Sequence, residues 1–404
     1  MPFATLNPAT GELLKSFPVT SAVEVEATLA RAAAALASWR PLSLSQRATI
    51  VGRAAGLLER DRERLGRLAS LEMGKPLAAA IGEVDKCAVG CRYFAENADH
   101  MLADEDITEP NGARERIRYE PLGVVLSIMP WNFPYWQTLR FAAPALIAGN
   151  AVLLKPAPST PQCGLAVTDL FREAGAPAGV FQALLIEPET IATVIADPRV
   201  AAVTLTGSER AGKAVAAAAG AALKKSILEL GGSDPFVVLP SADLDRAVSI
   251  AVKARMINNG QSCIAAKRFI VAASVYEAFK SRFVAAVAAL KLGPATDASA
   301  DVGPLATAAI RDGLAKQVER TVAAGAKVLV GGKAAAGPGF YYEPTVLEDV
   351  PAGSPAAAEE LFGPVAALFK AADADEALRL ANDTPYGLGA SVFTKDPDEA
   401  DRFA

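Results

Sequence analysis

The sequence predicts an α/β protein built from two doubly wound α/β domains. From residue 122 onward, short apolar runs alternate with segments of helical periodicity. Strands buried on both faces and separated by helices are typical of a parallel sheet covered on both sides. Residues 21–100 instead carry apolar residues at helical spacing only. A length of 404 residues accommodates two or three domains.

The first parallel sheet is expected between residues 122 and 231. Its buried strands are predicted at 124–128, 151–154, 180–186, 200–205 and 227–230. Helices are predicted between them at 135–147, 161–174, 189–196 and 209–222. Such sheets bind ligands at the carboxyl ends of their strands, so the residues that follow these strands are the first candidates for a site.

A second strand–helix set follows Gly231-Gly232, the expected domain boundary. Its strands are predicted at 236–239, 268–271, 327–330 and 365–369, and its helices at 242–256 and 275–290. Before the first sheet, residues 114–119 alternate charged with larger side chains after a Pro-Asn-Gly turn. That pattern favours an edge or solvated strand.

The composition excludes several classes of function. With a formal net charge of −5 and no Lys/Arg-rich run, neither nucleic acid nor a membrane is expected as a partner. No apolar stretch approaches the roughly 20 residues of a bilayer span. Residues 1–8 lack the features of a signal peptide, so a cytoplasmic location is expected.

The chain has four cysteines and one histidine. Cys87 and Cys91 share a helix face without further zinc ligands, so we expect an apolar pair and no metal. His100 lies in a polar helical stretch and is expected at the surface. Multi-histidine metal sites are thereby excluded, and a general base is expected to be a carboxylate or a lysine.

Two segments after predicted strands could bind anionic groups. Thr206-Gly207-Ser208 opens a helix, whose free N–H groups attract anions, although Ser208 as a plain N-cap is the favoured alternative. Asn132 lies between two aromatic residues and two prolines, in a rigid turn that fixes one amide as an oxyanion hole requires. On composition alone, a purely structural turn is the favoured alternative for that segment.

Two further residues could carry chemistry. Glu229 ends a predicted buried strand beside two glycines, where burial would raise its pKa toward that of a useful base. A capping or loop carboxylate is the alternative. Cys263 follows the helix end Asn258-Asn259-Gly260 in a turn where a thiolate can meet substrate, whereas Cys163 lies inside a helix. A buried, inert Cys263 is ordinarily the favoured alternative.

In this order, the motifs resemble those of the aldehyde dehydrogenase superfamily over nearly the whole chain. They are Asn7–Glu12, Glu72–Pro76, Pro130–Pro134, Lys155-Pro156, Thr206–Ser208, Glu229–Gly232, Gly260–Cys263, Glu360–Pro364 and Pro385–Leu388. Within the superfamily, Pro130–Gln137, Glu229–Pro235 and Cys263–Phe269 look like bacterial succinate-semialdehyde dehydrogenases of the NAD-preferring type.

The resemblance implies a cysteine mechanism. The Cys263 thiolate would attack the aldehyde, with the Asn132 amide and the Cys263 N–H holding the oxyanion. Hydride transfer to the nicotinamide would leave a thioester, which water activated by Glu229 would hydrolyse. Oxidation of succinate semialdehyde to succinate is the expected reaction, and another short aldehyde is the alternative.

The resemblance also implies a cofactor site. Lys155 would bond the adenosine ribose, Ser208 with Thr206 and Gly207 the pyrophosphate, and Glu360 the nicotinamide ribose. Phe362 and Trp131 would complete that site. Pro158 stands where relatives that favour NAD often carry Glu, so NAD with some use of NADP is expected.

For the substrate, the resemblance implies that Arg140 grips the carboxylate and that Trp136 lines the same pocket. Bidentate pairing by a guanidinium is a physical reason for such a role. Two positions depart from similar enzymes. Ile257 replaces a second arginine, and Ala265 replaces a cysteine that can form a regulatory disulfide.

The implied organisation has three parts. Residues 1–102 and 122–231 would form a Rossmann-like NAD(P)-binding domain, residues 103–121 an oligomerisation strand segment, and residues 232–404 the catalytic domain. A helix start at Asp396-Pro397 runs to Ala404 without a C-cap, so a truncated C-terminus is expected. A homodimer or homotetramer is expected if the tail is present.

Two other classes of function stay open on the sequence. A cysteine esterase using Cys263 would cleave esters without nucleotide and without oxidising aldehydes. A non-catalytic binding protein on the same fold would bind nucleotide without chemistry.

Overall fold

The computed structural model describes residues 3–404, and its contacts divide them into two compact units. The first comprises residues up to Thr5, Leu13–Glu72 and Ala78–Leu230. The second comprises Leu6–Glu12, Met73–Leu77 and Gly231–Ala404. The expected division of the chain placed residues 6–12 and 73–77 with the first part, whereas their contacts place them in the second.

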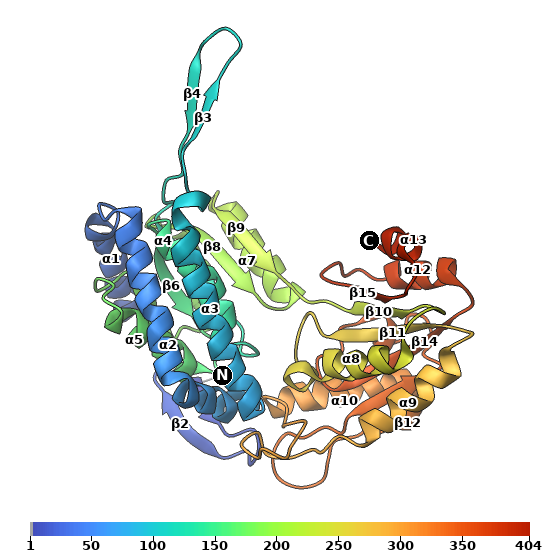
Figure 1. Cartoon of the computed structure of the whole chain (residues 1–404). Helices are drawn as coiled ribbons and strands as arrows, with labels where there is room; N and C mark the ends of the chain where they lie inside the picture. The colour runs from blue at the N-terminus through green and yellow to red at the C-terminus, as the bar shows by residue number, and fades with distance from the viewer. Residues whose placement is uncertain (1–2) are drawn as a thin grey trace. The chain divides into compact units, whose positions relative to one another are not determined.

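The first unit contains a five-stranded parallel sheet in the order β7-β6-β5-β8-β9 (Figure 1). Its strands are β5 (Val124–Ile128), β6 (Ala151–Lys155), β7 (Phe181–Ala183), β8 (Val200–Thr206) and β9 (Lys225–Glu229). The helices between them are α4 (Trp136–Ile147), α5 (Pro161–Glu173), α6 (Pro188–Ala196) and α7 (Glu209–Ala221). Each lies close to its predicted position.

Two apolar cores cover the two faces of this sheet. One joins β6 to α4, α5 and the helices α2 (Leu44–Met73) and α3 (Leu77–Met101). The other joins β5 and β8 to α6, α7 and part of α1 (Ala22–Trp39). Cys87, Cys91 and Cys163 are buried in the first core, as apolar packing predicts. The doubly wound arrangement is therefore confirmed.

The prediction that 227–230 is a buried strand is wrong. Strand β9 is the edge of the sheet, and Ile227 on it is 53% exposed. An apolar run alone does not distinguish an edge strand from a central one, because the missing neighbour leaves no local signal.

Strands β3 (Glu105–Thr108) and β4 (Arg114–Ile117) form an antiparallel hairpin that extends away from the rest of the first unit (Figure 1). The turn contains Gly112 at φ 85°, a conformation that favours glycine. All eight strand residues are exposed, which confirms a solvated strand at 114–117.

The second unit contains a six-stranded sheet in the order β12-β13-β14-β11-β10-β15, parallel except for β12. Its strands are β10 (Asp234–Val238), β11 (Ala266–Ala272), β12 (Lys327–Val330), β13 (Thr345–Glu348), β14 (Val365–Ala371) and β15 (Ser391–Phe393). Its helices are α8 (Leu244–Met256), α9 (Tyr276–Ala288), α10 (Ala308–Ala323), α11 (Pro355–Ala358), α12 (Ala374–Asn382) and α13 (Pro397–Phe403). Within residues 3–404, no helix is long and apolar enough to cross a bilayer.

Candidate functional site

The carboxyl edge of the five-stranded sheet gathers most of the predicted residues of the first unit. Strands β5 and β8 are neighbours, but the chain leaves β5 toward β6 on one side and β8 toward β9 on the other. This is the topological switch point at which doubly wound sheets bind ligands. The loop of Trp131 and Asn132 follows β5, and Gly207-Ser208 follows β8.

Asn132 is held in a buried loop, with 4% of its surface exposed. Helix α4 begins just after this loop and has no side-chain cap of its own at Tyr135. The buried Glu83 supplies one, because its Oε1 accepts hydrogen bonds from the N–H groups of Tyr135 and Trp136, each at 3.0 Å. A carboxylate from α3 therefore fixes the point where the Asn132 loop enters α4.

Glu229 is the last residue of β9, and its carbonyl accepts a hydrogen bond from Gly207 N–H at 3.0 Å. Its carboxylate Oε1 lies 4.0 Å from Nη2 of Arg140, which projects from α4. Both side chains are partly open, with 44% and 37% exposure. The burial expected for Glu229 is therefore wrong, and its partner is a guanidinium that the sequence places 89 positions earlier.

Ser208 caps α7, and its hydroxyl accepts a hydrogen bond from Ala211 N–H at 3.3 Å. The capping interpretation of this serine is thus confirmed. The same position puts the N-terminal N–H groups of α7 beside the ends of β8 and β9, because Thr206 pairs with Glu229 in the sheet. The helix start keeps its capacity for an anion.

Lys155 ends β6 and is only 6% exposed, and burial lowers its pKa to about 8. Its ammonium lies 5.6 Å from the centre of the Phe3 ring. Pro158 follows, and its carbonyl accepts a hydrogen bond from Ala4 N–H at 3.1 Å. The segment therefore has a cation at Lys155, and Pro158 provides no carboxylate three positions later.

Trp136 lies on α4, one turn before Arg140, and its ring packs against α3. The ammonium of Lys86 lies 4.0 Å above that ring, in cation–π geometry. Besides Arg140, a second cation, Lys86, therefore lies beside α4 at Trp136. The sequence analysis did not identify it.

In the second unit, a tight loop carries Cys263. Helix α8 ends at Met256, and the next residues include Asn258, Asn259 and Gly260 at φ 53°, 58° and 77°. Asparagine and glycine tolerate this left-handed region, so the predicted helix end is confirmed. The Asn259 amide donates to the carbonyls of Gly74 and Pro304, which anchors the loop.

Two glycines allow other segments to approach this loop. A Cβ on Gly232 would stand 2.6 Å from the Cys263 carbonyl oxygen. A Cβ on Gly260 would overlap the Gly363 carbonyl, in the segment that follows Glu360 and Phe362. Side chains at either position would displace the loop, so these glycines serve close packing at Cys263.

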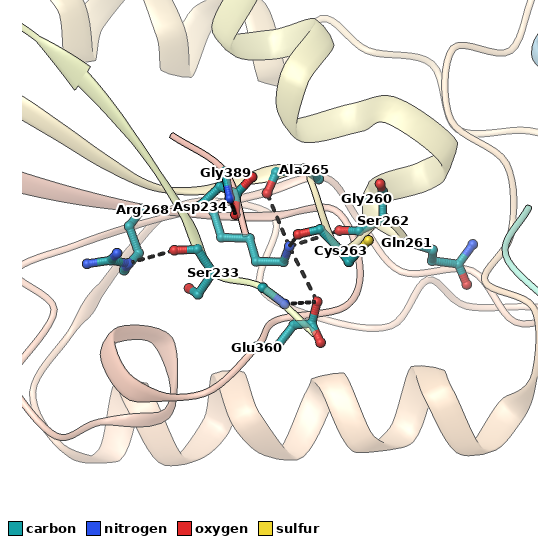
Figure 2. A network of polar contacts seen from close by, with 12 residues as sticks. Ser233, Asp234, Gly260, Gln261, Ser262, Cys263, Ala265, Arg268, Glu360 and Gly389 are labelled. Atoms are coloured by element: carbon teal, nitrogen blue, oxygen red, sulfur yellow. Dashed lines mark hydrogen bonds and ion pairs between the residues drawn. The ribbon is translucent and has the colours of Figure 1, made fainter. Parts of the chain in front are cut away.

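Cys263 is half-buried, whereas the other three cysteines are buried. Burial raises the pKa of its thiol, while the charge of Lys267 and a hydrogen bond from Ile264 N–H lower it. Glu360 lies nearby, where its Oε1 accepts a hydrogen bond from Gly232 N–H at 3.2 Å (Figure 2). Burial raises the pKa of Glu360, and Lys267 opposes that shift.

Within each of the two units, the structure brings several of the predicted site residues together. The first unit joins Arg140, Glu229 and Gly207, and the second joins Cys263 to the Glu360 segment. Sequence reasoning missed Glu83 and Lys267. Glu83 leaves no local signal, but a lysine within a strand of apolar residues such as β11 is unusual enough to be noticed.

Comparisons with known proteins identify the family of this chain. The family model for the aldehyde dehydrogenase family matches residues 1–404. A succinate-semialdehyde dehydrogenase [NADP(+)] 1 from Mycobacterium bovis is 52% identical over 405 residues, covering 100% of this chain and 89% of that protein. A succinate-semialdehyde dehydrogenase [NADP(+)] from Mycolicibacterium paratuberculosis is also 52% identical, with coverage of 100% and 86%.

Solved structures show the same fold. The succinic semialdehyde dehydrogenase of Streptococcus pyogenes, in complex with NADP+, superposes with a TM-score of 0.97 at 35% identity, covering 99% of this chain and 88% of that one. The succinate-semialdehyde dehydrogenase of Burkholderia pseudomallei gives 0.96 at 38% identity, with coverage of 100% and 84%. This chain therefore belongs to the aldehyde dehydrogenase family and is an NAD(P)-dependent oxidoreductase.

Proposed function

We propose that the enzyme oxidises succinate semialdehyde to succinate, with NADP as its principal cofactor and Cys263 as its nucleophile. The observation that carries the proposal is the loop of Cys263. Left-handed residues and close-packed glycines hold a half-buried thiol there, while the other cysteines of the chain are buried. The relatives named above as succinate-semialdehyde dehydrogenases supply the substrate.

The thiolate of Cys263 attacks the aldehyde carbon, and the carbonyl oxygen becomes an oxyanion. The Asn132 amide and the Cys263 N–H are the donors that we assign to this oxyanion. A nicotinamide cofactor, when bound, would supply the acceptor for the hydride of the substrate carbon, and a thioester would remain on the Cys263 sulfur. Water then adds to the thioester carbon, the C–S bond breaks, and succinate leaves with the water oxygen.

Glu229 is the base that we assign to this water, and it takes the proton as the water attacks. Its exposure suits the task, because a solvent-accessible carboxylate can pass the proton to bulk water. Arg140 is the residue that we assign to the substrate carboxylate, with Trp136 beside it on α4. Succinate semialdehyde has one carboxylate, which matches a single guanidinium.

The residues of the first unit fit a phosphorylated nicotinamide cofactor. The N-terminus of α7 offers N–H groups to a pyrophosphate, and Lys155 offers a cation at the end of β6. Pro158 neither accepts from a 2′-hydroxyl nor repels a 2′-phosphate. The preference for NAD expected from the resemblance finds no support in the relatives' names, which specify NADP.

Hairpin β3–β4 is the element that we assign to association between copies of the chain. Its exposed side chains include Ile107 and Ile117, which lie on neighbouring strands as a small apolar surface.

The direct test is formation of NADPH or NADH by the purified chain with succinate semialdehyde near pH 7. We expect faster turnover with NADP than with NAD, complete loss in Cys263→Ala, and retention in the control Cys91→Ala. Full activity of Cys263→Ala would refute the nucleophile. Turnover with other short aldehydes but not with succinate semialdehyde would refute the substrate.

A further inference from the structure

Lys267 is a buried cation that contacts residues 262–265, the loop that carries Cys263 and is called the nucleophile loop below. It is the second residue of β11 and is 1% exposed. Its ammonium donates to the carbonyls of Ser262, Cys263 and Ala265 at 2.8, 2.9 and 3.1 Å (Figure 2). An ammonium has three donors, and here each meets a carbonyl of the loop that precedes it.

These carbonyls fix the direction of the loop's N–H groups. Every peptide bond in residues 3–404 is trans, so the C=O of one residue and the N–H of the next point to opposite sides of their plane. With the Ser262 carbonyl turned toward Lys267, the Cys263 N–H points away from it. With the Cys263 carbonyl turned the same way, the Ile264 N–H also points away from Lys267, and the Ile264 N–H is one of the groups that lower the pKa of Cys263.

Other charges surround this ammonium. The Glu360 carboxylate lies 3.5 Å from it, and Asp234 and Arg255 also act on it electrostatically. Burial is the main cause that lowers the pKa of Lys267 to about 8. Holding a charge in such a place costs free energy, so packing alone does not account for a lysine here.

We propose that Lys267 is a positioning residue, whose ammonium orients two peptide planes so that Cys263 N–H faces the oxyanion and Ile264 N–H faces the thiolate sulfur. The proposal rests on the proposed role of Cys263 as nucleophile. Lys267 itself touches neither substrate nor cofactor, and it acts through the backbone of the loop.

Lys267→Met tests this, because it keeps an unbranched side chain, one atom shorter than lysine, and removes all three donors. Two quantities are measured, namely kcat near pH 7 and the pH dependence of Cys263 alkylation by iodoacetamide. We expect kcat to fall about 10-fold or more, toward the loss seen when an oxyanion donor is removed. The midpoint of alkylation should move to higher pH, because the Ile264 N–H is no longer held toward the sulfur.

Arg268→Met is a matched control. Arg268 is the next residue of β11, and its buried guanidinium likewise donates to three carbonyls, those of Ser233, Leu380 and Ala381. None of these belongs to the nucleophile loop. The control should lose comparable thermal stability while its alkylation midpoint stays that of the wild type.

Lys267→Leu provides a second variant if Lys267→Met does not fold, since it also removes all three donors. Unchanged kcat or an unchanged alkylation midpoint in a folded Lys267 variant would overturn the proposal. The Cys263→Ala variant separates the two claims. If it stays active, the nucleophile assignment fails, and if it is inactive while Lys267 variants behave as wild type, only the positioning role fails.

Discussion

The guanidinium of Arg140 lies 4.0 Å from the carboxylate of Glu229, so the residues assigned to the substrate carboxylate and to water activation form an ion pair. Both side chains are substantially exposed, and such pairs contribute about 0–1 kcal/mol. Arg140 can therefore exchange Glu229 for a substrate carboxylate at little cost. The same exchange would free Glu229 to accept a proton from water.

Arg140→Gln should raise KM for succinate semialdehyde by roughly 10- to 100-fold, because a hydrogen bond to a charged group is worth about 1.5–3 kcal/mol. KM for butanal, which has no carboxylate, should change little. Steady-state kinetics with both aldehydes measure the difference. An equal change for the two substrates would exclude Arg140 as the carboxylate ligand.

Glu229→Gln should leave thioester formation intact and slow its hydrolysis. Rapid mixing should then show a burst of about one reduced cofactor per active site, followed by turnover roughly 10²- to 10⁴-fold slower than in the wild type. If the variant lost both the burst and steady-state turnover, Glu229 would instead be required at or before hydride transfer.

Cofactor affinity should depend on pH through Lys155. Because burial lowers its pKa to about 8, the ammonium is charged below that pH and becomes neutral as the pH rises through it. Binding of NADP, measured by fluorescence titration, should therefore weaken above about pH 8. Lys155→Met should bind NADP weakly at every pH, and persistence of the same pH profile in that variant would exclude Lys155 as its source.

The buried ammonium of Lys155 also makes the free energy of unfolding depend on pH. Lys155 has a lower pKa in the folded chain than the ordinary 10.5, so the folded state binds fewer protons than the unfolded state between about pH 8 and 10.5. Its burial cost is thus fully present below pH 8 and is relieved as the pH rises through that window.

Glu83→Gln should destabilise the chain by about 1–3 kcal/mol, because it weakens the cap on two N–H groups at the start of α4. Since the same contacts hold the entry to α4 from the Asn132 loop, kcat should fall as well. Chemical unfolding and kinetics measure the two effects. Asp99→Asn, an exposed position on α3, is the control and should change neither.

The sequence predicts the parallel sheets, the helix starts and the loop of Cys263, because each depends on short-range patterns such as Asn258-Asn259-Gly260. It does not predict contacts between distant segments. Glu83 reaches Tyr135 across 52 positions, and β9 is an edge strand although its apolar residues resemble those of a central one. Lys267 was missed for a different reason, since its partners are close in sequence but their carbonyl directions are set by the tertiary fold.

The central claim is that a succinyl thioester forms on Cys263. The most direct measurement is mass spectrometry of Glu229→Gln after brief reaction with succinate semialdehyde and NADP, followed by acid quenching and digestion. The account predicts a mass increase of one succinyl group on the peptide that contains Cys263. NADPH formation with that peptide unmodified, or with the succinyl group on another residue, would contradict it.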